Sequence, residues 1–358
     1  MDPVTHIVTG VALSQFVPAP SRVWAAAAGF FFAILPDLDY VTTVNGRLSY
    51  LKHHRGFTHS VFALFLFIFL IAGLGRLVGG PRWFKPLLSI GFLVLASHLF
   101  LDWTTSYGTQ LFHPLSRVKF SLDWVFIIDP YLTALVAAAA LALLISTGWG
   151  RTVGAACLGL GIAYILLCGF YHHQALILAR QVFPHPSGDK TKCAALPQPF
   201  SPRHWLLVAA DSGEVRQAFV ELPCLPGGGK IPKPMEIPVR LDLRTPPRVP
   251  AATYNSPEML TVYRWQAVPG PHVTLTPETR RILDTYLAFS RFPILVANDH
   301  VPGGIILTWV DLRFSVPDRA IPFVLQVDLD DNGRLAAWQI GGPRLPINKP
   351  SHRNPRSG

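Results

Sequence analysis

Residues 53–79 read HHRGFTHSVFALFLFIFLIAGLGRLVG, a cluster of imidazoles followed at once by an apolar run. The run from 60 to 79 is long enough to cross a bilayer, which takes about 20 apolar residues. Carboxylates and imidazoles are costly at membrane depth, so they usually have a partner and a role there. The stretch therefore predicts a functional site at the end of a membrane helix.

Further apolar segments extend the predicted membrane domain to residues 1–180. Residues 86–101, 124–147 and 152–173 predict further spans, and the turn at 148–151 separates the last two. Residues 4–17 and 21–35 are too short to cross alone, so they predict a helical hairpin or partial insertions. The expected fold is an all-α transmembrane domain of about four full spans plus this hairpin. Buried core helices of a soluble protein are the alternative, which their length and lack of charge disfavour.

The composition agrees with a membrane protein. Of 358 residues, 50% are hydrophobic and 15% are charged, whereas soluble domains carry roughly 25% charged residues. The net charge is +10, but the chain has no run rich in Lys and Arg. Attraction to anionic lipid headgroups explains this distribution, so membrane lipids are expected as partners and nucleic acid is not. The first residues carry Asp2 and no basic segment, so no secretory signal peptide is expected.

Residues 181–346 predict a soluble, mostly β accessory domain, and residues 347–358 a disordered tail. Strand-like runs lie at 204–210, 214–222, 236–243, 258–268, 293–298, 304–315 and 323–329. Asp331-Asn332-Gly333 indicates a hairpin, and Thr276 is the expected N-cap of a helix that ends near 290. Cys193 and Cys224 could form a disulfide if this domain is extracytoplasmic.

The His and Asp residues of the membrane half fall into clusters that converge on one face. Tracing the crossings places the segments 36–39, 53–60 and 97–102 on the same side of the membrane, together with the C-terminal domain. His6 joins them if residues 4–35 form a hairpin. The short loops of the opposite face carry basic residues and no acidic ones, which slightly favours the cytoplasm for that face and an extracytoplasmic site. These residues are Arg22, Arg76, Arg82, Lys85 and Arg151.

The clusters have the chemistry of a metal centre. His98 and Asp102 are four residues apart on a helix, so both project from one face. Asp37 and Asp39 would repel each other unless Arg55 or a cation neutralised them. Imidazole and carboxylate together are the ligands of a Zn-type or Mn-type hydrolytic centre, and no Gly-x-Ser-x-Gly, Walker or His-Glu-x-x-His motif competes.

Two residues are predicted to act directly on the substrate. Asp39 could serve as a general base if it is not a ligand. Arg55 could bind an anionic substrate group through two parallel hydrogen bonds. An interfacial Arg that reaches the lipid headgroups is the alternative for Arg55.

These motifs resemble the inner-membrane metal-dependent hydrolase family of the YdjM type. The resemblance covers residues 1–135 and is carried by Thr5-His6, Pro-Asp-Leu-Asp at 36–39, His-Arg-Gly-Phe-Thr-His-Ser at 54–60 and Ser-His-x-x-x-Asp at 97–102. That family is distantly similar to zinc-dependent phospholipase C and P1 nuclease, which cleave phosphoesters. The resemblance implies one or two divalent ions, with Zn favoured, and His54 and Asp39 as secondary ligands; His113 could be an extra one. The implied primary ligands are His6, Asp37, His59, His98 and Asp102.

The expected function is a metal-dependent hydrolase of the bacterial inner membrane. Its substrate would be a lipid or another membrane-proximal ester, with a phosphoester favoured. A divalent metal-ion transporter is one alternative, although transporters place such residues at the membrane midplane and often show inverted repeats. A non-catalytic membrane scaffold is the other, and the sequence indicates no oligomeric state.

Overall fold

The computed structural model describes residues 1–145, 148–183, 192–211, 213–224, 234–239 and 253–341. It divides into two compact units. The first holds most of the helices, and the second holds both β-sheets. The predicted boundaries at 180 and 346 stay predictions.

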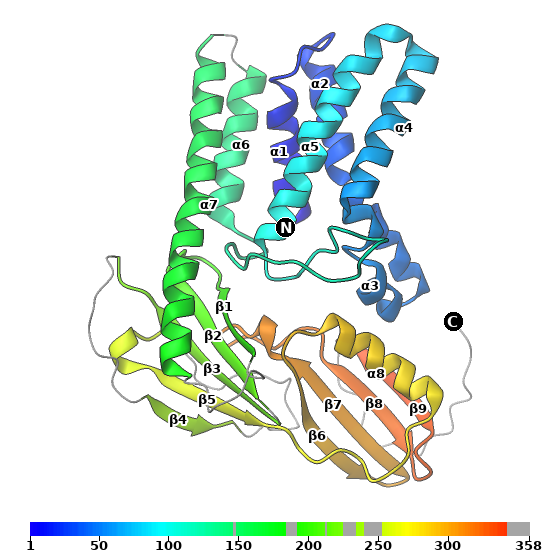
Figure 1. The fold of residues 1–358 in the computed structure, drawn as a ribbon, viewed down its shortest axis with the longest axis vertical. Helices are drawn as coiled ribbons and strands as arrows, with labels where there is room; N and C mark the ends of the chain where they lie inside the picture. Colours follow the sequence, from blue (N-terminus) through cyan, green and yellow to red (C-terminus); the bar gives the residue numbers. More distant parts are fainter. Residues whose placement is uncertain (146–147, 184–191, 212, 225–233, 240–252, 342–358) are drawn as a thin grey trace. The chain divides into compact units, whose positions relative to one another are not determined.

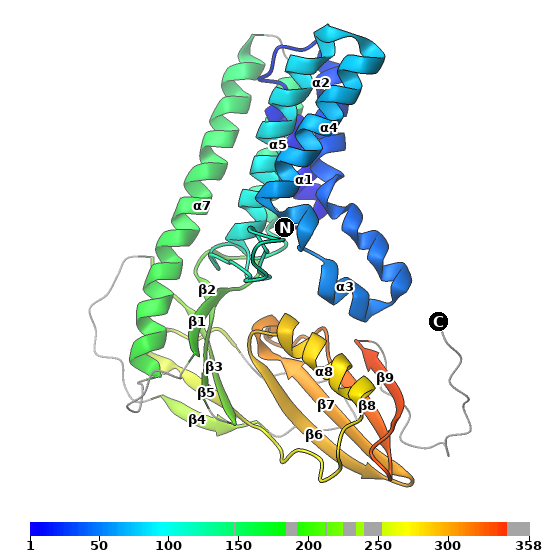
Figure 2. The ribbon, with the colours of Figure 1, turned by 45° about the vertical axis from the view of Figure 1, so that its right-hand side comes forward.

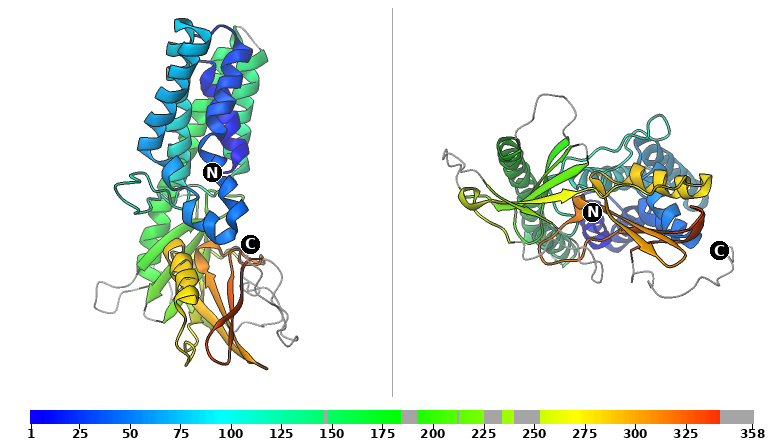
Figure 3. Two further views of the ribbon diagram at one scale, coloured as in Figure 1. Left: turned by 90° about the vertical axis from the view of Figure 1, so that its right-hand side faces the viewer. Right: turned by 90° about the horizontal axis from the view of Figure 1, so that it is seen from below.

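The N-terminal unit is a bundle in which α1, α2 and α4 to α7 run side by side (Figures 1 and 3). Short 3-10 helices, η1 to η3, lie between the longer elements. The bounds are α1 Pro3–Ser14, α2 Arg22–Ile34, η1 Pro36–Asn45, α3 Arg47–His53, η2 Phe57–His59, α4 Val61–Gly79, η3 Pro81–Trp83, α5 Phe84–Thr104, α6 Pro130–Ile145 and α7 Trp149–Val182.

Local polar residues decide where several of these helices begin. The Ser60 hydroxyl accepts a hydrogen bond from the backbone N–H of Ala63 at 3.1 Å and caps α4. An N-cap side chain of this kind satisfies one backbone donor that the first helical turn leaves open. Asp2 caps α1 and Ser21 caps α2 in the same way.

Three helices are long and apolar enough to cross a membrane: α4, α5 together with η3, and α7. A fourth span results if α2 and η1, which meet at a bend of 44°, cross as one. Only 22% of the most apolar window of α4 is buried, so its outward face suits lipid and not a soluble core. The predicted fold class, transmembrane helices followed by a β domain, is confirmed.

The predicted span at 124–147 is shorter than expected. Asp129 accepts hydrogen bonds from the backbone N–H groups of Tyr131 and Leu132, at 3.0 and 2.9 Å, and so starts α6 at Pro130. The helix has 16 residues, and the residues before it are not helical. Residues 146–147 lie outside the described residues.

Helices α1 and α2 approach each other closely through two glycines. A Cβ atom on Gly10 would lie 2.7 Å from the carbonyl oxygen of Gly29. Small residues let membrane helices pack backbone against backbone, which matters where lipid tails are as apolar as Leu. This contact holds α1, which carries His6, against the helix that leads into Asp37.

The C-terminal unit contains two sheets and one long helix. The first sheet has the strand order β1-β2-β3-β5-β4 and the second β6-β7-β8-β9; α8 lies along one face of the second (Figure 2). The bounds are β1 Lys192–Pro197, β2 His204–Asp211, β3 Glu214–Glu221, β4 Met235–Pro238, β5 Thr261–Gln266, α8 Pro277–Phe289, β6 Pro293–Val301, β7 Gly304–Asp311, β8 Leu325–Asp330 and β9 Leu335–Ile340, with short 3-10 turns at Pro257–Met259 and Leu312–Phe314.

Every predicted strand run overlaps an observed strand, and Thr276 caps α8 as predicted. Strand β1 was missed. The tail at 347–358 and part of the run at 236–243 lie outside the described residues. Neither Cys193 nor Cys224 is in a disulfide in the structure, so the bond considered from the sequence is not formed there.

Candidate metal centre

Eight predicted residues meet at the end of the bundle where α5 finishes. Each is bonded to at least one other residue of the set, although they come from segments far apart in sequence. They are His6 on α1, Asp37 and Asp39 on η1, His54 and Arg55 after α3, His59 on η2, and His98 and Asp102 on α5.

Four of their side-chain atoms form close nitrogen–oxygen pairs. His59 Nε2 lies 3.2 Å from Asp37 Oδ1 and 3.3 Å from Asp102 Oδ2. His98 Nε2 lies 3.8 Å and 3.5 Å from the same two oxygens. A tetrahedral Zn²⁺ with bonds of about 2.0–2.1 Å has neighbouring ligand atoms about 3.3–3.4 Å apart. The four nitrogen–oxygen distances among these atoms, which we call the tetrahedral set, are close to that spacing.

A hydrogen bond to the backbone orients the His98 ring so that its Nε2 faces Asp37 and Asp102. Its Nδ1 lies 2.9 Å from the carbonyl oxygen of Ala33, so Nδ1 carries the proton and donates it. Its Nε2 is then a lone-pair acceptor, and it is buried without a hydrogen-bond partner among the described residues, as is Asp102 Oδ2. Metal-binding His residues commonly donate their second N–H to a carbonyl or carboxylate in this way. Two unpaired buried acceptors facing each other fit a cation.

His59 is oriented by a carboxylate. Its Nδ1 lies 3.3 Å from Asp39 Oδ2 and 3.0 Å from the Thr58 hydroxyl. Burial lowers the pKa of His59, but the hydrogen bonds to Asp37 and Asp39 and the charge of Asp102 outweigh it and raise the pKa to about 9. A cation at Nε2 would have to displace a proton that this acidic environment strongly favours.

Two groups of three possible ligands share His98 in this cluster. Ligand atoms of His6, Asp37 and His98 lie within 4.8 Å of one another, as do those of His59, His98 and Asp102. The rings of His6 and His98 are stacked, with centroids 3.6 Å apart and an interplanar angle of 10°. His6 Nε2 also contacts Asp102 Oδ1 at 3.2 Å.

Arg55 faces inward and not toward an opening. Its side chain is 2% exposed, and its guanidinium contacts Asp102 Oδ1 at 2.8 Å and the Thr105 hydroxyl at 2.8 Å. The guanidinium also lies 4.7 Å from the ring centroid of Tyr107. The Met1 amino group contacts the same Asp102 oxygen, so Oδ1 faces positive charge while Oδ2 faces the two imidazoles.

Two further histidines lie outside the tetrahedral set. His54 Nδ1 contacts Asp39 Oδ1 at 2.8 Å, and His54 is in neither possible ligand group found among the described residues. His113 packs its ring against Phe57, with centroids 5.8 Å apart, and is in neither group. Burial lowers the pKa of His54.

Sequence reasoning missed the residues that support the ligands. Thr58 donates to Asp39 at 3.0 Å, and Thr105 and Tyr107 hold Arg55. Thr58 lies inside the His-Arg-Gly-Phe-Thr-His-Ser motif, so its position was a usable signal. The Ala33 carbonyl had none, because a backbone oxygen carries no mark in the sequence.

The fold and the sequence comparisons together define a multi-pass inner-membrane protein with a β domain at its C-terminal side. Residues 1–176 match the model of the family described as "YdjM inner membrane protein", so the membrane half is similar to that family over nearly its whole length.

The curated proteins include the "Uncharacterized protein YfhP" of Bacillus subtilis (strain 168). It is 31% identical over 179 residues, which cover 48% of this chain and 53% of that protein. The match thus spans about half the length of this relative. No solved structure matches the chain, and the expected similarity to zinc-dependent phospholipase C and P1 nuclease stays a prediction.

Proposed function

We propose that this protein is a membrane-bound metal-dependent hydrolase that cleaves an ester bond, with a phosphoester of a lipid or membrane-proximal substrate favoured. The observation that supports the proposal is the tetrahedral set: two Nε2 atoms and two carboxylate oxygens, whose four nitrogen–oxygen pairs are 3.2–3.8 Å apart. A divalent cation held there, with Zn²⁺ favoured, would supply a Lewis acid that activates water or polarises the ester.

In this proposal each residue of the chain has a defined part. His59, His98, Asp37 and Asp102 hold the cation. One ion is expected, because both possible ligand groups use His98 and its Nδ1 is committed to the Ala33 carbonyl. The side chain of Asp37 is 22% exposed, whereas those of His59, His98 and Asp102 are at most 1% exposed. Asp37 therefore marks the side from which a substrate reaches the centre.

Asp39 and Arg55 have contacts that fit positioning roles. Asp39 accepts bonds from His54, the Arg55 backbone N–H, Thr58 and His59, which fixes the His59 ring. Arg55 fixes Asp102 so that Oδ2 faces the imidazoles. For Asp39 to act as a general base, or for Arg55 to bind the substrate, these hydrogen bonds and ion pairs would have to break.

The charge beside the centre favours hydrolysis over ion transport. A transporter must let a cation leave along a path, but the buried Arg55 guanidinium places a fixed positive charge 2.8 Å from Asp102. That charge suits an anionic substrate and opposes the passage of a second cation. The predicted residues also lie at helix ends and not at the middle of a span.

The test uses the full chain purified in detergent. Metal content is measured by elemental analysis, and hydrolysis is measured with a chromogenic phosphodiester and a fluorescent phospholipid, before and after chelation and Zn²⁺ return. Asp37→Asn is compared with Asp129→Asn, a matched change of a carboxylate that caps α6 outside the cluster. We expect loss of hydrolysis in Asp37→Asn alone. Bound metal without hydrolysis, combined with cation flux in proteoliposomes, would support the transporter instead.

A further inference from the structure

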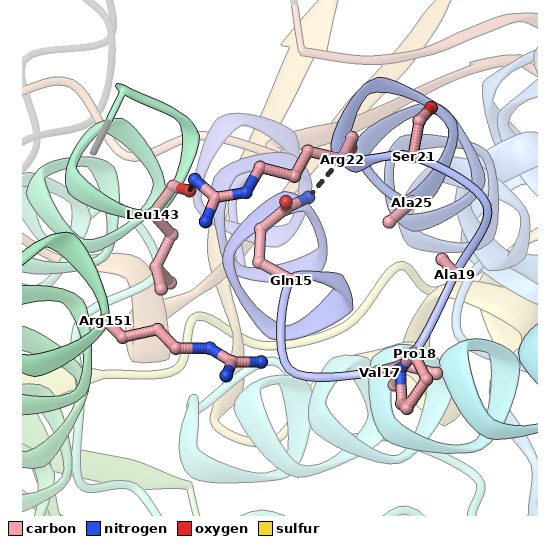
Figure 4. Close-up of a pocket in the computed structure, with 9 residues that line it drawn as sticks. All are labelled: Gln15, Val17, Pro18, Ala19, Ser21, Arg22, Ala25, Leu143 and Arg151. Atoms are coloured by element: carbon pink, nitrogen blue, oxygen red, sulfur yellow. Dashed lines mark hydrogen bonds between the residues drawn. The ribbon is translucent and has the colours of Figure 1, made fainter. Parts of the chain in front are cut away.

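A second site lies at the other end of the membrane helices. A cavity of about 200 Å³ opens where the turn between α1 and α2 faces the last turn of α6 and the first turn of α7 (Figure 4). Its volume exceeds that of a single water molecule several-fold. It does not contain any residue of the metal centre.

The charge of the cavity is positive. Arg22 and Arg151 both extend their guanidinium groups into it (Figure 4), and none of the described residues that line it is acidic. Arg22 donates to the carbonyl oxygen of Leu143 at 3.1 Å, which fixes its guanidinium across the gap. Gln15 braces the turn by donating to the Arg22 carbonyl oxygen at 3.2 Å. A planar guanidinium group held in this way matches the oxygens of a phosphate.

The position of the cavity corresponds to lipid headgroups. Trp24 and Trp83 lie at this end of the bundle with ring centroids 4.7 Å apart, and Trp149 at the start of α7 is 82% exposed. Trp side chains are enriched where a membrane meets water. Exposed apolar residues of α7, such as Val153, continue from the cavity along the bundle.

We propose that this cavity binds the phosphate of an anionic phospholipid. Two of the described residues that line the cavity carry a guanidinium group and none carries a carboxylate, so the lining is net positive. A zwitterionic lipid brings its own ammonium group into that field, whereas a lipid such as phosphatidylglycerol brings only negative charge. The acyl chains then follow the apolar surface of the helices. This site is independent of the metal centre and of the proposed hydrolysis.

The experiment counts lipids on the full chain in detergent by native mass spectrometry, with phosphatidylglycerol, phosphatidylcholine or inorganic phosphate as probe. The key variant is Arg151→Gln, with the charge reversal Arg151→Glu as a second. Arg76→Gln is the control, since Arg76 lies in the last turn of α4 and does not line the cavity. A melting curve for each variant confirms that it folds.

We expect phosphatidylglycerol to bind at least about fivefold more weakly to Arg151→Gln, the effect of one Arg near a charged membrane surface. Binding to Arg151→Glu should be weaker still, and Arg76→Gln should match the wild type. Equal binding by wild type and Arg151→Glu would overturn the proposal. So would displacement of the lipid by millimolar inorganic phosphate, which would assign the cavity to free anions.

Discussion

The substitution Asp39→Asn tests whether the Asp39 carboxylate orients a ligand or itself binds the ion. Asparagine keeps the shape of the side chain and one carbonyl oxygen for the Arg55 backbone N–H, but it removes the negative charge beside His59 Nδ1. Loss of such an outer partner typically lowers metal affinity about 10–100-fold. That corresponds to about 1.4–2.7 kcal/mol of binding free energy. Asp102→Asn, which changes a direct ligand, should cost more.

The assay is a competition between the protein and a chromogenic chelator for Zn²⁺ at one pH, in one detergent. Asp129→Asn is the control, because Asp129 is a buried carboxylate of the same unit that caps α6. It should lower thermal stability while leaving the Zn²⁺ dissociation constant within twofold of the wild type. An unchanged dissociation constant in Asp39→Asn would refute the orienting role, and an equal loss in Asp129→Asn would show that the effect is not local.

Four further expectations concern pH, packing, the β domain and sidedness. Since the pKa of His59 is about 9, its proton competes with the cation below that pH, so Zn²⁺ affinity should rise by up to about tenfold per unit between pH 6 and 8; a flat profile contradicts this. Gly29→Ala should destabilise the bundle by about 1–3 kcal/mol in detergent melts, because its Cβ meets the Gly10 carbonyl, while Gly73→Ala has open space and should not. Asp311→Asn should destabilise the β domain by about 3–5 kcal/mol in chemical denaturation, because it removes the carboxylate charge that lies 3.0 Å from the buried Arg313 guanidinium; exposed Asp331→Asn serves as the unaffected control. An alkaline phosphatase fused after residue 346 should be active if the domain is extracytoplasmic. An inactive phosphatase fusion together with a fluorescent cytoplasm-only reporter fusion would place the domain in the cytoplasm.

The sequence predicted that the site residues lie close together, because the membrane crossings can be counted along the chain. Once the apolar runs fix which segments lie on the same face, Asp37, His59 and His98 have to converge. The spacing of His98 and Asp102 needs only helix geometry. These features depend on chain connectivity and helical periodicity, which are both legible in sequence.

Other features depended on tertiary contacts that leave no local mark. Arg55 was expected either to bind an anionic substrate group or to reach the lipid headgroups. Its long side chain turns inward to Asp102, a direction that depends on what packs around it. The apolar run from residue 124 predicted one continuous span, but Asp129 caps α6 and the helix begins after it. Strand β1 at Lys192–Pro197 is short and lacks the alternation that distinguishes a half-buried strand.

The atoms of the tetrahedral set come from separate elements, which affects how the protein assembles in the membrane. Its four atoms come from η1, η2 and α5, which are brought together only when the helices have assembled. Lipid tails give helices little hydrophobic reason to associate, whereas a ligand that binds only the assembled state adds about 4 kcal/mol when present at 1,000 times its dissociation constant. Metal supply would then govern how much of the chain survives membrane proteolysis. Cells starved of the ion would contain less of the protein, and not merely an inactive form of it.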